Sequence, residues 1–521
     1  HTLLHVKVYL MLFFSLSFSW VSAQLVDSIF IPNHQYNEFL LHKIWENPTS
    51  FSALKLQDFT QTSLTYTRQE NHLKRVQTAE EVNTMMFSSN GIFQINPQLK
   101  LLGDFNYQFS TEKNIGYVLS NQRTDNFYVL NPNYLFTKKA SNWEKQNYAL
   151  KGGAIYQIKN FDFGIITTYG NQSAFRKSDP RPEINTAEYS GKILAGYTYK
   201  NHQISAFGGA GTQKDNHQVM AVNEYINAPA NDEYFVRFSN GYGRQIYFNS
   251  FSKFLYKTDS KTFGGGYRFQ NNNSAFFANY HYQKSMENLF AKDANGQVFF
   301  DENLVAYKYR LITHHADFSY LHQKNEHLFY SEIALNSITG DNYNAIEQGQ
   351  NYRMTLDEAS FRSIYQKTEG KKVKLGLTTQ ITLQDFSATD LLGVTEKKVK
   401  NLSLNIKASK DLYYSPDTKL NLETGINAYF PINSSLSYTK VSSTNVIYEG
   451  VIKNDQAYDD TSKIGPEIGV YFYKKINKKN HIKIFTQLNS VIALSNHYQD
   501  TIINYNKKSN FVLSSGISLF Y

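Results

Sequence analysis

The sequence predicts an all-β protein, a transmembrane antiparallel β-barrel of about 18 strands (range about 16–20). Three observations predict it: a closing segment with one apolar face, an export signal at the N-terminus, and apolar residues at every second position along almost the whole chain. Strands repeat their side-chain direction every two residues, so each such segment has an apolar and a polar face. Repetition over so many segments favours a closed barrel with lipid outside and water inside.

The N-terminus has the features of a secretory signal peptide. Lys7 is followed by an apolar run to Trp20, and the small residues of Val21-Ser22-Ala23 precede Gln24. This pattern predicts a signal peptide at 1–23 with cleavage after Ala23, because the run is too short to span a bilayer. The sequence begins with His, so its first residue need not be the translation start. Without cysteine, neither a disulfide framework nor a lipid-anchored cysteine is expected.

Residues 24–60 lack the strand repeat. They contain the segment Asn37 to Trp45, followed by Glu46-Asn47-Pro48. This stretch is expected to be a short N-terminal element, either a hatch inside the barrel lumen or a periplasmic segment beneath it. The barrel itself is expected to occupy residues 61–521.

Composition agrees with a barrel and excludes several other classes. The chain has 39 Tyr and 38 Phe, but its mean hydropathy is only -0.48, which excludes a helical membrane protein. Tyrosine and phenylalanine favour strands and supply the aromatic girdles of a barrel. The net charge of +9 is spread along the chain, so nucleic acid is not an expected partner.

The number of strands is predicted from the positions of the turns and from the rule that it is even. Tight turns are expected at 96–98, 159–160, 415–418 and 477–480, and long polar connectors near 111–146, 174–186 and 436–461. A direct count gives about 19 strands, but single-chain barrels have even numbers because both termini are periplasmic. One segment between 232 and 270 is therefore surplus. A barrel this wide needs a water-filled lumen or a plug.

The two faces of the strands supply candidate functional residues. Charged residues on the more polar face are expected to point into the lumen, and these are Lys100, Asp104, Lys374, Lys407, Glu423 and Glu467. The last strand is expected to close the barrel and to point an apolar file at lipid, made of Phe511, Leu513, Ile517, Leu519 and Tyr521.

Loop 111–146 is the best candidate for surface recognition, because exposed aromatic residues mark binding surfaces. Its aromatic residues are Tyr117, Phe127, Tyr128, Tyr134, Phe136 and Trp143. The alternative is that these side chains fold the loop over the barrel mouth.

Catalytic and metal-binding patterns are weak, and neither enzymatic activity nor a cofactor or bound metal is expected. Before His314-His315 the apolar residues of the repeat stand at odd-numbered positions, and after it they stand at even-numbered positions. The two sets are Tyr307, Tyr309 and Leu311, then Ala316, Phe318 and Tyr320. This shift by one residue predicts a β-bulge near the rim. The acidic residues Glu449, Asp455, Asp459 and Asp460 are expected to be solvated loop charges, with a cation site as the alternative.

The start at Trp45-Glu-Asn-Pro48, the strands rich in Asn, Lys and Tyr, and the aromatic terminus resemble large outer-membrane barrels of the Bacteroidota, from a family of unknown function. Asn47-Pro48-Thr49-Ser50 also resembles the hatch of the long-chain fatty acid transporter family. The resemblance implies a Gram-negative outer membrane with both termini periplasmic, and it implies membrane lipid and the barrel assembly machinery as partners.

The resemblance to the Bacteroidota barrels implies a role in nutrient or metal uptake. Together with the polar lumen face, it predicts a channel or transporter component for the uptake of small molecules or nutrients. The alternative is a non-transporting barrel subunit of a larger complex with a TonB-dependent receptor or a surface lipoprotein.

Overall fold

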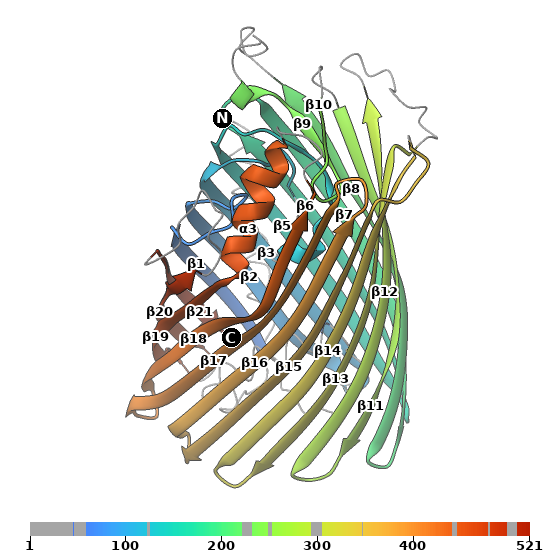
Figure 1. Cartoon of the computed structure of the whole chain (residues 1–521). Helices are drawn as coiled ribbons and strands as arrows, with labels where there is room; N and C mark the ends of the chain where they lie inside the picture. Colours follow the sequence, from blue (N-terminus) through green and yellow to red (C-terminus); the bar gives the residue numbers. More distant parts are fainter. Residues whose placement is uncertain are drawn as a thin grey trace, which may run out of the picture.

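A computed structural model describes residue 45 and residues 59–121, 126–220, 232–247, 253–292, 305–345, 347–439, 445–477, 480–496 and 508–521. Within these ranges the chain forms one closed antiparallel barrel of 18 strands and a separate three-stranded sheet (Figure 1). The predicted fold class and the strand number of 18 are confirmed.

The barrel strands follow one another around the wall in chain order. They are β1 (Phe59–Asn71), β2 (Glu81–Asn96), β3 (Leu99–Ile115), β5 (Ser141–Ile158), β6 (Phe161–Arg176), β7 (Arg181–Tyr199), β8 (His202–Met220), β11 (Lys253–Gln270), β12 (Ser274–Lys292), β13 (Tyr307–Lys324), β14 (His327–Asn344), β15 (Tyr352–Glu369), β16 (Lys372–Asp390), β17 (Thr395–Tyr414), β18 (Thr418–Tyr438), β19 (Thr461–Lys475), β20 (His481–Asn496) and β21 (Ser509–Phe520).

The first and last strands close the barrel. β1 pairs antiparallel with β21, with Leu64 opposite Ile517 and Ser63 opposite Ser518. Backbone hydrogen bonds join Thr60 and Tyr521 in both directions, at 2.9 and 3.0 Å. The two ends of the barrel sequence therefore meet at the same rim, as an even strand number requires.

The two rims of the barrel differ. Short turns such as 159–160 and 271–273 join strands at one rim, which we name the turn end and which is at the bottom of Figure 1. Longer connectors join strands at the opposite rim, the loop end. Two loop-end connectors are short, 177–180 and 391–394, although a long polar connector was expected near 174–186.

The surplus segment of the strand count belongs to the loops. β4 (Asn133–Phe136), β9 (Arg237–Asn240) and β10 (Gln245–Tyr247) form the three-stranded sheet, with β9 in the centre. β9 and β10 lie in the region where one barrel strand too many was expected. They are strands, but they pair with a loop segment and not with the barrel wall.

The loop end also contains helical turns: η3 (Phe127–Val129), η5 (Asp232–Tyr234), the π-helical turn η6 (Tyr448–Ile452) and the short helix α3 (Lys453–Asp459). The connector 436–461 was expected to be an extended polar loop, and η6 and α3 correct that expectation. In the described part of the chain, no helix has the length and apolar character that would let it cross a membrane.

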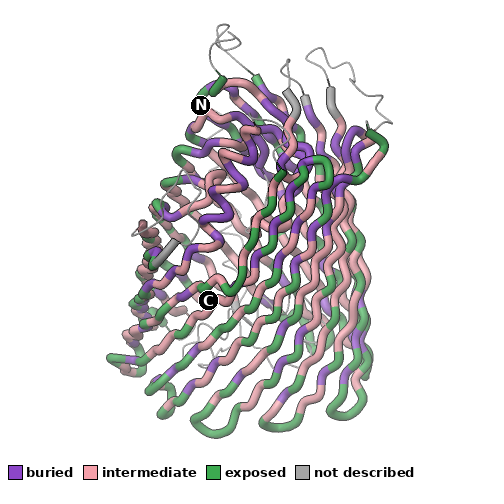
Figure 2. The backbone as a smooth tube through the Cα atoms, viewed as in Figure 1, coloured by how far each residue is buried: buried purple, intermediate pink, exposed green. Residues whose placement is uncertain are grey.

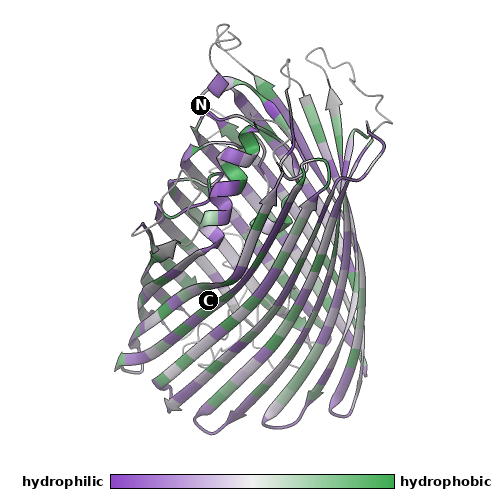
Figure 3. Ribbon diagram, in the orientation of Figure 1, coloured by the Kyte–Doolittle hydropathy of each residue, from purple (hydrophilic) through white to green (hydrophobic). Residues whose placement is uncertain are grey.

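Side chains alternate between an outer and an inner face along every long strand, seen as alternating colours in Figures 2 and 3. Phe511, Ile517 and Leu519 of β21 are exposed on the outer face together with Ile193 and Ile204, whereas Ser518 is buried inside. Leu513 is separated from Phe511 and Ile517 by an even number of positions, so it belongs to the same outward face of β21. A continuous exposed apolar surface on a closed barrel is the surface that faces lipid in a membrane-spanning barrel.

The polarity of the two faces inverts toward the loop end. On β17 the outer face carries Glu396 and Lys398 near the loop end and Leu404 and Ile406 further along, while the inner face changes from Val399 to Asn405 and Lys407. The strands have 12 to 21 residues, more than the roughly 9–11 that a bilayer requires, so they project beyond it. Inside the projecting part the wall carries clusters of buried apolar residues, against which loops pack.

This inversion corrects the predicted bulge at His314-His315. β13 pairs with β12 and β14 without a register shift from Tyr307 to Leu321. Tyr307 and Tyr309 are buried on the inner face where loops cover it, and Phe318 and Tyr320 are exposed on the outer face where lipid is expected. The apolar residues change from the inner to the outer face because loops lie inside the barrel near the loop end and lipid is expected outside it further along. The backbone of the strand stays regular.

Candidate functional site

The loop end of the barrel is filled by loops that fold inward. We name the described parts of these loops, residues 72–80, 116–140, 232–247 and 445–460, the loop plug. Leu119, Leu135 and Phe238 of the plug are buried against the inner-face residues Phe254 and Leu289 of the wall. Phe136, Ile447 and Val451 form a second buried cluster with Val76, which joins three loops.

The aromatic residues predicted for surface recognition lie inside this plug or beneath it. Phe136 is fully buried, Trp143 is 2% exposed on the inner face of β5, and Tyr134 accepts a hydrogen bond from Gln77 at 2.9 Å. Tyr128 packs on Phe386 of the wall with ring centroids 4.4 Å apart, and Tyr117 lies against the Phe136 cluster. Phe127 lies beneath the guanidinium of Arg75, 5.5 Å from its ring centroid. The expected exposed surface is therefore corrected, because these side chains hold the loop over the mouth.

Asp459, the last residue of α3, connects the plug to the wall. It accepts hydrogen bonds from Arg75 of loop 72–80, from the Tyr128 hydroxyl at 2.8 Å and from Lys397 Nζ of β17 at 2.6 Å. The side chains of Asp459 and Lys397 are 1% and 2% exposed. We name Asp459, Arg75, Tyr128 and Lys397 the Asp459 cluster, and it joins two loops, one helix and the barrel wall.

The two buried carboxylates of α3 differ in their pKa values. Burial disfavours the charge of Asp459, but Arg75 and Lys397 outweigh burial and hold its pKa well below the ordinary value. Burial raises the pKa of Asp455, which lies 3.8 Å from Arg75. The acidic loop residues were expected to be solvated or to hold a cation. Instead, the guanidinium and ammonium groups of the protein neutralise Asp459.

Below the plug, three of the six predicted lumen residues meet on the inner wall. Lys407 of β17 forms ion pairs with Glu423 of β18, at 3.6 Å, and with Glu467 of β19. Asn427 donates to Glu467 at 3.1 Å. The Lys407 network is therefore a polar, hydrogen-bonded patch on neighbouring strands.

The other three predicted lumen residues are separate from this network. Lys100 and Asp104 share the face of β3 that carries the buried Leu102. Lys374 lies at the turn end of β16, is exposed and pairs with Glu369. Lys100, Asp104, Lys407, Glu423 and Glu467 lie on the inner face of their strands, and the last three contact one another. Lys374 lies at a bulge of β16, next to the buried Val373, so its prediction as a lumen residue is corrected.

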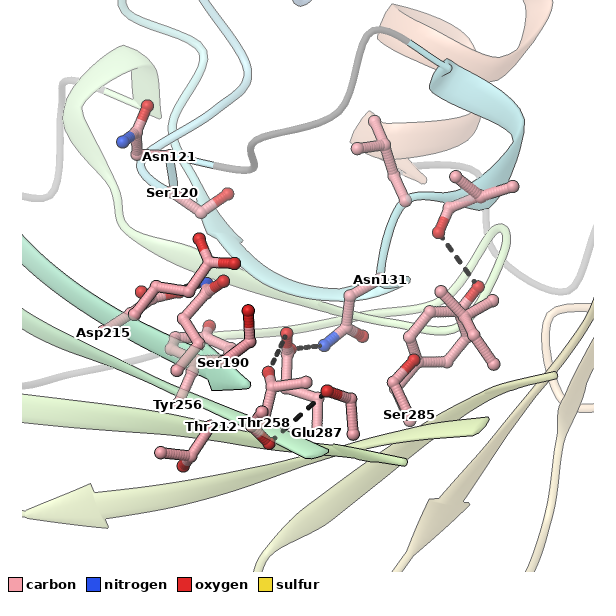
Figure 4. A pocket seen from close by; sticks show the side chains of 18 of the residues that line it. Ser120, Asn121, Asn131, Ser190, Thr212, Asp215, Tyr256, Thr258, Ser285 and Glu287 are labelled. Atoms are coloured by element: carbon pink, nitrogen blue, oxygen red, sulfur yellow. Dashed lines mark hydrogen bonds between the residues drawn. The ribbon is translucent and has the colours of Figure 1, made fainter. Parts of the chain in front are cut away.

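Two cavities lie between the loop plug and the wall. The first has a volume of about 380 Å³, and we name it the acidic cavity (Figure 4). Its wall comes from β7, β8, β11, β12 and β13, and loop 116–140 covers it. The second cavity, about 550 Å³, lies below α3 and is lined by Arg75, Lys407 and Lys463.

Sequence patterns did not reveal the acidic cavity. Its lining includes Glu188, Asp215, Glu287 and His217 from strands far apart in the chain. The available signal was the run of polar residues on the inner faces of β8 and β12, such as Gln213, Asp215 and His217. Without the register of neighbouring strands, that signal does not show which residues share one space.

Of the predicted N-terminal segment 24–60, the structure describes Trp45, Phe59 and Thr60, and the last two belong to β1. The side chain of Trp45 packs against Ile166, Leu194 and Phe207, which are buried on the inner faces of β6, β7 and β8. Trp45 therefore lies in the barrel lumen. The predicted signal peptide 1–23 and the motif Asn47-Pro48-Thr49-Ser50 lie outside the described residues.

The two adjacent histidines do not form one site. His314 points outward and contacts the Tyr280 hydroxyl at 2.8 Å, while His315 points inward and contacts Asn336 at 2.5 Å. Within the described ranges, no group of three or more His, Asp or Glu side chains is arranged to hold a metal ion.

A family model described as a family of unknown function, DUF6850, matches residues 48–521. The chain belongs to this family. The matched region of the DUF6850 chain contains all 18 barrel strands, both cavities and the described loop plug. No curated protein matches the chain.

Several solved structures are similar to this DUF6850 chain at low identity. The siderophore receptor PiuA from Acinetobacter baumannii is 10% identical, with 89% of this chain and 82% of that chain covered and a TM-score of 0.42. BauA, the ferric preacinetobactin receptor from Acinetobacter baumannii, is 8% identical, with 89% and 80% covered and a TM-score of 0.39. The alcaligin outer-membrane receptor FauA from Bordetella pertussis is 8% identical, with 88% and 75% covered and a TM-score of 0.41.

Proposed function

We propose that this DUF6850 protein is an outer-membrane barrel that passes small hydrophilic solutes through its lumen, and that the loop plug gates the passage. In this proposal the turn end faces the periplasm. The observation that carries the proposal is the contrast inside the barrel. A plug with buried apolar clusters and the Asp459 cluster occupies the loop end, and a polar wall with the Lys407 network lies below it.

The polar wall supports a passage for hydrophilic solutes. Burying charges in a protein interior is costly unless they are paired or meet water. Lys407, Glu423 and Glu467 are paired, and Lys407 also borders the 550 Å³ cavity below α3. Charged groups on a lumen wall are the elements that select ions and solutes in channels.

The plug supports gating because one cluster connects its parts. Asp459 bonds to Arg75, Tyr128 and Lys397, so a change at this carboxylate affects two loops and the wall at once. Removing one partner of a buried ion pair costs about 3–5 kcal/mol, because the other charges stay buried without compensation. Loss of the Asp459 charge is therefore expected to loosen the plug.

Single-channel conductance in planar bilayers tests this proposal. The wild-type protein is expected to show rare, brief openings, and Asp459→Asn is expected to open for longer and more often. Asp460→Asn is the matched control, since the adjacent carboxylate accepts a hydrogen bond from Ser434 and lies outside the Asp459 cluster. Equal conductance of Asp459→Asn and wild type, with both barrels folded, would count against gating by the plug.

A second candidate function is a non-transporting barrel subunit of a larger outer-membrane complex. The loop plug favours it, because loops that fold into the mouth obstruct a passage, and such a barrel could instead bind a TonB-dependent receptor or a surface lipoprotein. In that case neither wild type nor Asp459→Asn would conduct, and a partner would co-purify from gently solubilised membranes.

A further inference from the structure

The acidic cavity is a half-open space with polar and apolar lining and one dominant sign of charge. Among the described residues that line it, the ionisable side chains other than tyrosine are Glu188, Asp215, Glu287 and His217. Figure 4 shows Asp215, Ser190, Thr258 and Glu287 on the wall strands, with Ser120 and Asn131 on the covering loop. Three carboxylates and one imidazole give the cavity a negative character.

Two of the carboxylates are held in position by neighbouring side chains. Glu287 accepts hydrogen bonds from Asn131 of the covering loop and from the Thr258 hydroxyl, the latter at 3.3 Å. Asp215 accepts from Gln213 Nε2, with its two oxygens 3.1 and 2.9 Å away. These hydrogen bonds fix both carboxyl groups at the wall of the cavity.

Two buried groups of the covering loop that line the cavity have no hydrogen-bond partner among the described residues. These are Ser120 Oγ and Asn121 Nδ2, on side chains of residues that are 9% and 6% exposed. The Ser120 hydroxyl points into the open space between the loop and the wall (Figure 4). Buried polar groups in native proteins nearly always have a partner, so such groups beside a cavity indicate a missing ligand or water.

The remaining lining determines what kind of ligand fits. Hydroxyl and amide groups from Ser190, Ser260, Gln283 and Ser285 share the cavity with the aromatic rings of Tyr256 and Tyr309. Small-molecule sites of about 300–1,000 Å³ combine apolar rings with a few placed polar groups, and the volume of 380 Å³ falls in this range. Many hydroxyl and amide partners suit a ligand with several hydroxyl groups, and the carboxylates suit a positive charge on it.

We propose that the acidic cavity is a binding site for a positively charged, polyhydroxylated solute, of which an amino sugar is the simplest example. The proposal rests on the proposed function, since it names the class of solute that the barrel would take up. Glu287 and Asp215 contact the ammonium group, and the hydroxyl and amide groups of the wall and of Ser120 contact the solute hydroxyls.

Isothermal titration calorimetry on the detergent-solubilised full chain tests the site with three sugars that differ mainly in charge: glucosamine, glucose and glucuronate. Glucosamine is expected to bind at least about tenfold more tightly than glucose, because a hydrogen bond to a charged group contributes about 1.5–3 kcal/mol. Glucuronate is expected not to bind. Equal binding of the three sugars, or binding of Mg²⁺ with none of glucosamine, would overturn the proposal.

Two variants assign the binding to the cavity. Glu287→Gln and Asp215→Asn are each expected to weaken glucosamine binding about tenfold or more. Asp104→Asn is the matched control, because its carboxylate lies on the inner face of β3 and does not line the cavity. Unchanged glucosamine binding in both cavity variants would overturn the assignment. If one variant does not fold, the proposal is tested by the other variant and by the preference of the wild-type protein among the three sugars.

Binding and conductance separate this proposal from the proposed function. Conductance with no preference for glucosamine would leave gated transport standing and remove the amino-sugar site. Selective glucosamine binding without conductance in wild type or in Asp459→Asn would leave the site standing and remove the gated passage.

Discussion

Lys407 lies on the inner face of β17 between carboxylates that belong to β18 and β19. Lys410, three residues further along the same strand, lies on the outer face and is exposed. Two lysines of one strand therefore have opposite environments, which are set by the period of two. Lys407 is paired, so its effect on solutes in the lumen depends on the combined charge of Lys407, Glu423 and Glu467.

Neutralising Lys407 is expected to change the ion selectivity of the open barrel. In Lys407→Gln, Glu423 and Glu467 lose their cationic partner, so the wall becomes negative and the reversal potential in a salt gradient shifts toward cations. The measurement is the reversal potential of Asp459→Asn with and without Lys407→Gln.

Lys410→Gln on the outer face is the matched control for this substitution, and it is expected to leave the reversal potential unchanged. A similar shift from both lysine variants would show that selectivity does not depend on the Lys407 network.

At the scale of elements, β17 passes through two different surroundings along its length. Near the loop end it presents Glu396 and Lys398 to solvent and Val399 to the plug, and further along it presents Leu404 and Ile406 outward. Hydrophobic burial depends on which side of the wall is free of water, so the apolar face changes sides where the barrel leaves the bilayer. The inversion therefore marks the edge of the lipid-facing belt.

This position of the belt leads to a prediction about the outer face. Ile406→Arg is expected to destabilise the folded barrel in lipid vesicles by about 2–4 kcal/mol, because a charge on the lipid face near the bilayer centre loses its hydration. Glu396→Arg, on the same face but at the loop end, is expected to change the unfolding free energy by less than about 1 kcal/mol. Urea unfolding monitored by tryptophan fluorescence measures both values, and equal destabilisation by the two substitutions would contradict the assigned belt.

At the scale of the whole molecule, closure depends on two strands that are far apart in sequence. β1 and β21 pair along most of their length, and the hydroxyls of Ser63 and Ser518 form a buried hydrogen bond of 2.8 Å. Because closure removes free strand edges, this pairing protects the polar backbone groups of both terminal strands from lipid. The seam is thus required for the barrel to exist in a membrane.

An engineered disulfide tests the seam directly, and the natural chain has no cysteine to interfere. Ser63→Cys/Ser518→Cys is expected to form a disulfide on mild oxidation, because directly opposed residues of antiparallel strands fit the required Cα separation of about 4.4–6.8 Å. The product is a chain closed into a large loop, which migrates faster on a non-reducing denaturing gel. Ser63→Cys/Ser514→Cys is the control, since Ser514 lies opposite Thr67, and equal cross-linking of both pairs would contradict the register.

Much of the fold could be predicted because it depends on local patterns. Alternation along 99–110 and 420–430 identified lumen and lipid faces, and turn residues marked the connections at one rim. For the aromatic residues of loop 111–146, the structure agrees with the alternative that they fold the loop over the mouth. The acidic residue Asp459 was expected to be a solvated loop charge, and it is buried because loops from distant parts of the chain fold into the mouth together.

The sequence by itself determined that the chain forms a closed barrel with an even number of strands, since a period of two and alternating turn lengths are properties of neighbouring residues. Only the tertiary structure decided which face of each strand is apolar at each position along the barrel axis. It also decided that loops fold into the mouth and that Glu188, Asp215 and Glu287 line one cavity. The physical reason is that burial and charge pairing depend on contacts across the barrel. Those contacts join residues far apart in the chain, such as Lys397 and Asp459 or Arg75 and Asp459, and no local pattern records them.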